Sequence, residues 1–155
     1  MVKDCDRSRV VAHFEVVFGF GMWYLNEMNE NEVSKVIVDG AIDVHRLLGG
    51  PGLLESVYEE AFAFELQLRG LRVERQKVVP LIFKGQRLAS DLRLDLLIEG
   101  LVIVECKATA LHNSIFEAQA LTYLRLLDLR LALIVNFGQR LVSRGIRRVV
   151  NGLPA

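Results

Sequence analysis

Charged residues interrupt two apolar, strand-forming runs in the segment RLDLLIEGLVIVECKA, residues 93–108. Asp95 lies within the first run, and Glu105 and Lys107 lie near the end of the second. Burying an unpaired charge costs free energy comparable with the whole stability of a domain. A chain with this segment can therefore fold only if the three charges gather at one place in the sheet, with each other or with a ligand.

The turn at Gly100 decides whether these charges meet. A two-residue loop would set Asp95 opposite Val104, facing away from Glu105. A three-residue loop, or a bulge, sets Asp95 directly opposite Glu105, and Gly100 can adopt the positive φ that such a loop needs. Both faces of the strands are apolar, so only the charges distinguish the registers. They favour the second register, because Glu105 and Lys107 already share a face.

Two touching carboxylates need a positive partner. At 4 Å in a partly buried site they repel by ~4 kcal/mol. Lys107 offsets one negative charge, whereas a hard divalent cation such as Mg²⁺ offsets both and prefers oxygen ligands. The residues alone leave two interpretations open: a metal site with a lysine beside it, and a salt-bridged trio at the end of a sheet.

Composition indicates a single globular domain, since the 155 residues are 52% hydrophobic and 25% charged. Because the net charge is +0, any nucleic-acid binding must depend on a local patch. The basic cluster is either a solvated set beside a strand or a track for a phosphate backbone; it contains Arg140, Arg144, Arg147 and Arg148. Two isolated cysteines fit no metal spacing or disulfide framework, so we expect a reduced, cytoplasmic protein.

The first 27 residues do not fit the domain. Residues 10–25 are apolar enough to suggest a signal peptide or an anchor, but polar residues interrupt them and they are shorter than the ~20 residues of a membrane span. A helix start follows Met28, as at a fresh N-terminus. We expect residues 1–27 to be an extension from a misassigned start codon, and residues 28–155 to form one domain without a membrane segment.

Periodicity predicts helices over 30–48, 53–69 and 113–127, and strands over 73–83, 91–98, 101–107, 131–137 and 146–150. Asn29 or Asn31 would cap the first helix and Gly70 would end the second. The second helix should bury a stripe of Leu54, Val57, Tyr58, Ala61, Glu65 and Leu68. This order predicts an α/β fold with a central mixed sheet flanked by helices.

The pattern D…E-x-K on adjacent strands resembles the signature of the PD-(D/E)XK nuclease superfamily. GLLESVY, residues 52–58, resembles the name-giving motif of one branch, the bacterial GxxExxY proteins. The likeness also covers AIDVHRLLGG, EAQALTYL and LIVNFG and runs from about Met28 to Val150. It implies a restriction-endonuclease-like core. One extra glycine before Pro51 departs from the pattern and could shift the side chain of Glu55.

The resemblance implies a role for each residue of the charged hairpin. Asp95 and Glu105 would hold Mg²⁺, or Mn²⁺, with the backbone carbonyl of Cys106 as a further ligand. Lys107 would orient or deprotonate the attacking water and stabilise charge on the phosphate. The Cys106 side chain points to the opposite face, and we expect it to be a small core residue.

Helical residues would complete the site. The resemblance implies that Glu55 binds the metal directly or through water, and that Gln119 and Tyr123 bind the scissile phosphate or brace the site. Without it, Glu55 is an ordinary solvated residue, and Gln119 and Tyr123 share one face of an ordinary amphipathic helix. His45 and His112 are expected to be packing or surface residues.

Two functions follow. The first is a Mg²⁺-dependent nuclease that hydrolyses phosphodiester bonds of DNA, or of RNA, with a metal-activated water. The alternative is a catalytically silent binding or regulatory module of the same fold, alone or as a homodimer. Carboxyl groups of Asp95 and Glu105 on opposite faces would favour the alternative.

Overall fold

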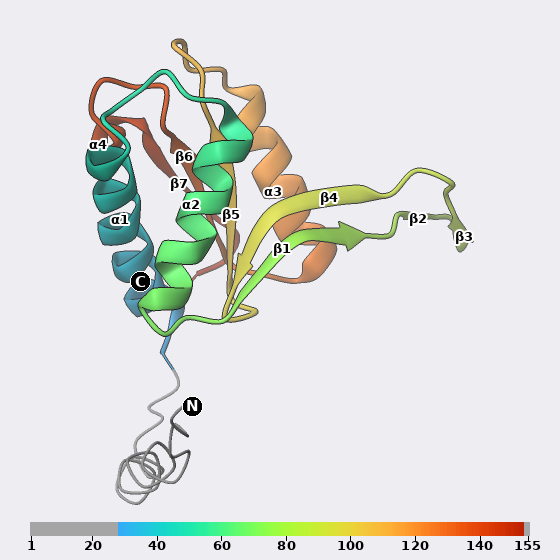
Figure 1. Cartoon of the computed structure of the whole chain (residues 1–155). Helices are drawn as coiled ribbons and strands as arrows, with labels where there is room; N and C mark the ends of the chain where they lie inside the picture. The colour runs from blue at the N-terminus through green and yellow to red at the C-terminus, as the bar shows by residue number, and fades with distance from the viewer. Residues whose placement is uncertain (1–27, 154–155) are drawn as a thin grey trace, which may run out of the picture.

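A computed structural model describes residues 28–153. The predicted extension over residues 1–27 lies outside this range. A five-stranded sheet has α1 and α2 on one face and α3 on the other (Figure 1). The elements in chain order are α1 (Glu30–Leu47), α2 (Glu55–Leu68), β1 (Val73–Val79), β2 (Ile82–Phe83), β3 (Gln86–Arg87), β4 (Leu92–Ile98), β5 (Val102–Lys107), α3 (Ile115–Leu127), β6 (Leu131–Asn136), α4 (Val142–Gly145) and β7 (Ile146–Val150).

The sheet is mixed, as predicted. Its order is β1-β4-β5-β6-β7, and only the central pair, β5 and β6, is parallel. That pair is joined by α3, because parallel neighbours need a long crossover whereas antiparallel neighbours need only a short turn. The α/β fold with a central mixed sheet is therefore confirmed.

The single strand predicted over residues 73–83 is two strands in the structure, β1 and β2. Residues 73–83 do not form a continuous strand, because Pro80 has no N–H to give to a ladder. β1 ends at Val79, and β2 pairs instead with β3 around a turn at Lys84 and Gly85, both with positive φ. This small hairpin extends from the body of the molecule at the end of the β1–β4 ribbon (Figure 1). The sequence did not predict the short α4.

Asn29, rather than Asn31, caps α1. Its Oδ1 accepts hydrogen bonds from the backbone N–H of Asn31 and of Glu32, both at 3.0 Å, and the Glu32 carboxylate accepts from the Asn29 N–H at 2.9 Å. This reciprocal capping box satisfies donors that a helix start leaves free. The sequence left Asn29 and Asn31 open as caps. Asn29 is favoured because Glu32 follows it by three residues, the spacing of a capping box.

The predicted buried stripe of α2 is wrong at Leu54, Val57 and Leu68, which are exposed, whereas Tyr58 is buried and Ala61 and Glu65 are partly buried. The helix buries Tyr58, Glu59, Phe62, Ala63 and Leu66, whereas Leu54 and Leu68 are 73% and 67% exposed. Apolar residues occur on more than one side of this helix, so spacing alone does not select a face. Tyr58 and Phe62 determine which face is buried, because large aromatic rings bury the most apolar area and both of these rings contact Phe137. Gly70 ends the helix with positive φ, as predicted.

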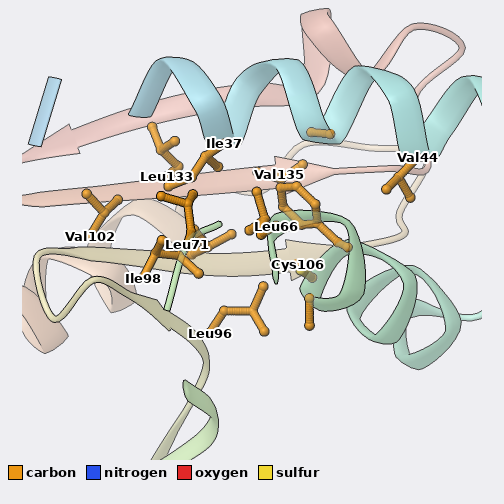
Figure 2. Packing of buried hydrophobic residues seen from close by; sticks show 14 of the residues in the cluster. Ile37, Val44, Leu66, Leu71, Leu96, Ile98, Val102, Cys106, Leu133 and Val135 are labelled. Atoms are coloured by element: carbon orange, nitrogen blue, oxygen red, sulfur yellow. The ribbon is translucent and has the colours of Figure 1, made fainter. Parts of the chain in front are cut away.

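The main core lies between the α1–α2 layer and the sheet. Figure 2 shows side chains of α1, α2, β4, β5 and β6 packed there, including Ile37, Leu66, Leu96 and Val135. Cys106 is fully buried in this cluster, as expected for a small core residue. A second cluster lies beneath α3, which buries Ala120, Tyr123 and Leu124. Among residues 28–153, no helix combines the length and the apolar character needed to span a membrane.

Candidate active site

The hairpin between β4 and β5 adopts the predicted register. Leu96 pairs with Val104 and Ile98 with Val102, which leaves a loop of three residues, 99–101. Within it the Leu101 N–H donates to the Ile98 carbonyl at 2.9 Å. Gly100 has the expected positive φ of 71°, and the preceding glutamate also has one, 54°. The paired positions end at Leu96 and Val104, and Asp95 and Glu105 are the next residues along the two strands.

The loop conformation is supported from outside the hairpin. The Glu99 N–H donates to the Arg72 carbonyl at 2.9 Å, and the Arg72 guanidinium donates to the Glu99 carbonyl at 3.1 Å. The Glu99 carboxylate in turn accepts from the Arg72 N–H. These contacts stabilise a positive φ that is unfavourable for a residue with a Cβ. The sequence did not predict this brace, because the two residues are far apart in the chain.

Asp95, Glu105 and Lys107 meet on the face of the sheet that α3 covers. The Lys107 Nζ lies 3.5 Å from Glu105 Oε2 and 3.9 Å from Asp95 Oδ2. Asp95 Oδ2 also accepts the backbone N–H of Cys106 at 2.8 Å, which fixes its orientation. The three charges therefore form one cluster, as the register argument predicted, and not a set scattered over both faces.

Glu105 is the most constrained of the three. Its residue is 3% exposed, and its pKa rises from 4.5 to about 7, first because of burial and then because of the negative charge of Asp95; Lys107 counteracts both. Its Oε1 is buried and finds no hydrogen-bond donor among residues 28–153. A buried acceptor without a partner is costly, so this oxygen needs a donor or a cation that the described residues do not supply.

Lys107 remains a cation in this environment. Burial alone would lower its pKa, but the nearby charges of Glu105, Asp95 and Glu55 outweigh burial and raise it. The Phe116 ring of α3 lies 5.5 Å from the Nζ and adds a cation–π contact. Phe116 was not singled out from the sequence, although its spacing to Gln119 and Tyr123 places it on the same helix face.

Glu55 begins α2 and is exposed. Its charge acts on Lys107, but the described part of the chain contains no group of three His, Cys, Asp or Glu side chains close enough to hold one metal ion. Glu55 as a direct ligand therefore stays a prediction. The glycine-rich loop before it is tied down by Tyr58, whose hydroxyl donates to the Gly50 carbonyl at 2.6 Å and accepts from the Leu53 N–H at 3.2 Å.

Gln119 and Tyr123 are brought to the same face by α3. The Gln119 amide donates to the Tyr123 hydroxyl at 2.7 Å. Burial raises the pKa of Tyr123, the Gln119 hydrogen bond counteracts it, and the charges of Glu105 and Asp95 raise it further. The pair thus lies near the carboxylates, and its role in binding phosphate or bracing the site stays a prediction.

Asn136, which the sequence did not reveal, holds the end of the site strand. It pairs with Lys107 across the parallel ladder, and its Oδ1 accepts the N–H groups of Thr109 and Gly138, both at 3.0 Å. A Cβ at Gly138 would come within 2.5 Å of the Thr109 backbone, so the close approach needs glycine. In the sequence, the sign of this arrangement is Gly138, which follows Asn136 by two residues at the end of a predicted strand.

His45 and His112 lie outside the cluster, as expected. The buried His45 Nε2 is 3.0 Å from the Gln139 carbonyl, which makes it a packing residue that holds the loop after β6. His112 lies 2.9 Å from a carboxylate oxygen of Glu117 on the surface.

The comparisons with known proteins agree with the geometry. The family model of the PD-(D/E)XK nuclease superfamily matches residues 31–149. This span contains the whole five-stranded sheet except its last residue, all four helices apart from the first residue of α1, and every site residue named above. Neither a curated protein nor a solved structure matches the chain. A family match over most of the chain shows membership, and the chain belongs to the PD-(D/E)XK nuclease superfamily.

Proposed function

We propose that the chain is a Mg²⁺-dependent nuclease, able to use Mn²⁺, that hydrolyses phosphodiester bonds with DNA as its preferred substrate. Within the superfamily we assign it to the GxxExxY branch, on the motif at residues 52–58. Nucleases of this superfamily usually use divalent metals. The observation that carries the proposal is that Asp95 and Glu105 share one face with a single lysine, and that Glu105 Oε1 is buried without a partner.

The donor set fits a hard divalent cation. Glu105 Oε1 has no hydrogen-bond partner among residues 28–153. Burial and then the negative charge of Asp95 raise the pKa of Glu105 to about 7, and Lys107 offsets this only in part. Asp95 uses one oxygen for the Cys106 N–H and retains the other. With the Cys106 carbonyl these groups would supply oxygen ligands, which Mg²⁺ prefers, and leave positions for water. Glu55 would join through a water molecule, since its charge acts on the site from α2.

A bound divalent ion would supply a nucleophilic water at neutral pH and charge stabilisation for the phosphate. Lys107 keeps its proton because Glu105 and Asp95 raise its pKa. We therefore assign it the role of a fixed cation that stabilises negative charge on the phosphate, in preference to that of a general base. Gln119, exposed above the buried Tyr123, would present its amide to a phosphate oxygen.

The direct test is cleavage of single-stranded, duplex and branched DNA and of RNA by the full chain, with Mg²⁺, with Mn²⁺ and with a chelator. Lys107→Ala should reduce cleavage by roughly 10²–10⁴-fold, because the cation opposite the developing charge is lost. Lys35→Ala, which removes an exposed lysine of α1, is the matched control and should cleave like the wild type. Equal cleavage by the Lys107 variant would reject the assignment.

A second function is favoured by one observation: Asp95 and Glu105 have no third acidic, histidine or cysteine neighbour at metal-binding distance within residues 28–153. It is a catalytically silent module of the same fold that binds or regulates, alone or as a homodimer. Metal titration separates the two functions. A nuclease site should bind millimolar Mg²⁺ or Mn²⁺ and raise the melting temperature, whereas a silent module should do neither.

A further inference from the structure

Two adjoining hollows lie beyond the end of β6. The larger, of about 280 Å³, is lined by Gln139, Arg140, Leu141 and Arg144. The smaller, of about 100 Å³, shares Gln139 and Arg144 with it and reaches toward Arg147. We call the pair the arginine hollow, after Arg140, Arg144 and Arg147. It contains no residue assigned to the site above, although Asn136, the strand neighbour of Lys107, lines its inner end.

The sheet register places Arg147, which lines the smaller hollow, on the same face as the carboxylates. Glu105 pairs with Ile134, and Ile134 pairs with Arg147, so Arg147 stands in the same row as Glu105, two strands away. Two strand spacings amount to ~10 Å. The next residue, Arg148, faces the other way and donates to Asn31 and Ser34 of α1. The basic cluster seen in the sequence is therefore divided between two faces.

Within the described part of the chain, the three arginines of the hollow have no paired carboxylate, whereas His112, which also lines the smaller hollow, lies 2.9 Å from a carboxylate oxygen of Glu117. Among residues 28–153, no acidic group lies within 4.0 Å of Arg140, Arg144 or Arg147. Arg147 Nη1 donates to the carbonyls of Arg144 and Ile146, at 2.9 and 3.1 Å, which holds the guanidinium in place and leaves its other donors free. Planar, oriented guanidinium donors suit the paired oxygens of a phosphate.

We propose that the arginine hollow binds a phosphate group of the nucleic-acid strand, neighbouring the phosphate held at Asp95, Glu105 and Lys107. The substrate class rests on the proposed nuclease function; the location rests on the register, the hollow and the unpaired guanidinium groups. The hollow would fix the strand beside the cleavage site. It would also give an almost neutral protein a local electrostatic contact with its substrate.

The test measures binding without cleavage. The full chain is titrated in a chelator against single-stranded and duplex oligonucleotides, each with a 5′-phosphate and with a 5′-hydroxyl, at several salt concentrations. The double variant Arg144→Gln/Arg147→Gln should weaken binding and reduce the slope of log K against log salt by about 1, as expected for one lost phosphate contact. The control Arg125→Gln/Arg130→Gln removes the same charge from exposed residues at the opposite end of β6 and should leave the slope unchanged.

Each outcome decides the inference. Binding and slope in the double variant equal to the control overturn it, whether or not the wild type cleaves. If only the double variant loses binding and the wild type shows no metal-dependent cleavage, the hollow is retained and the nuclease function is rejected. Failure of the wild type to bind any oligonucleotide overturns the hollow, and the nuclease is then decided by the cleavage assay with metal. A loss seen only with 5′-phosphorylated strands assigns the hollow to a terminal phosphate; a loss with both ends assigns it to an internal diester. The rim variant Arg140→Gln provides the same comparison if the double variant does not fold.

Discussion

The two faces of β5 differ in the chemistry of the side chains that they carry. Val102, Val104 and Cys106 point toward α1 and α2 and are fully buried in an apolar cluster. Glu105 and Lys107, which alternate with them, point toward α3, and their charges lie close to that of Asp95. A slip of one residue would exchange the two faces. The register therefore decides both which side chains enter the apolar cluster and whether the charged side chains meet.

This difference separates stability from chemistry. On the α1–α2 face the packed side chains are apolar apart from a few satisfied groups, such as the Tyr58 hydroxyl with its two hydrogen bonds. On the α3 face a carboxylate oxygen of Glu105 is buried without a donor, and the arginine hollow lies two strands away. We expect mutations on the first face to change the free energy of unfolding, and mutations on the second to change ligand binding and pH dependence.

The largest effect on stability is expected for Phe137→Ala. Phe137 is fully buried, stacks on Tyr58 with ring centroids 4.8 Å apart, and meets Phe62 edge-on at 5.5 Å. Removing the ring leaves a cavity between α2 and the sheet. The free energy of unfolding, measured by chemical denaturation, should fall by about 3–5 kcal/mol. Phe83→Ala, in the exposed β2–β3 hairpin, is the matched control and should cost far less. A loss below about 1 kcal/mol at Phe137 would show that this face does not dominate stability.

The sequence predicted the charged face better than the apolar one. Asp95, Glu105 and Lys107 determined the hairpin register because misplaced charges cost far more than misplaced apolar residues. The same logic fails for α2, whose residues are apolar on several sides, so that its buried face depends on Phe137 from a distant strand.

The remaining differences also come from contacts between distant parts of the chain. The brace from Arg72 to the hairpin loop, and the bond of Asn136 to the Thr109 backbone, join residues that no short motif connects. Local signals for the Asn29 cap and the break at Pro80 lie within a few residues, but the sequence prediction left Asn31 open as the cap and placed one strand over residues 73–83. The opposite facing of Arg147 and Arg148 follows from strand alternation once β7 is placed.

A smaller effect on stability is expected for Glu105→Gln without metal. Unlike Phe137→Ala, this substitution should increase the free energy of unfolding at high pH relative to the wild type. The pKa of Glu105 is about 7 in the folded chain and 4.5 otherwise. The folded state therefore binds more protons between these values, and the wild type loses stability as pH rises through this range. Glutamine removes this dependence. Relative to the wild type, the variant should gain stability from pH 5 to pH 8, by at most about 3 kcal/mol.

Denaturation in a chelator at pH 5, 6, 7 and 8 measures this gain, with the exposed Glu60→Gln as control. Addition of Mg²⁺ sharpens the result, because a cation and a proton compete for the same carboxylate. The wild type should gain more stability from Mg²⁺ at pH 8 than at pH 6, and the Gln variant should gain little at either. Parallel stability curves for wild type and variant across pH would contradict the buried, uncompensated charge.

The smallest effect on stability is expected for Tyr123→Phe, which lies where the two kinds of face meet. Tyr123 packs in the apolar cluster beneath α3, while its hydroxyl accepts a 2.7 Å hydrogen bond from Gln119 near the carboxylates. Loss of one such bond should cost about 1 kcal/mol in denaturation.

Cleavage kinetics then separate bracing from direct contact with phosphate. If the hydroxyl only positions Gln119, then Tyr123→Phe should lower cleavage no more than Gln119→Ala does. The double variant should then be little worse than Gln119→Ala alone, because the hydroxyl acts through the amide that Gln119→Ala removes. If each group contacts the phosphate, the two losses should add. A Tyr123→Phe variant with unchanged cleavage and a stability loss near 1 kcal/mol would assign the hydroxyl to packing. The boundary between the stabilising and the reactive face would then lie between Gln119 and Tyr123, one turn apart on the same helix.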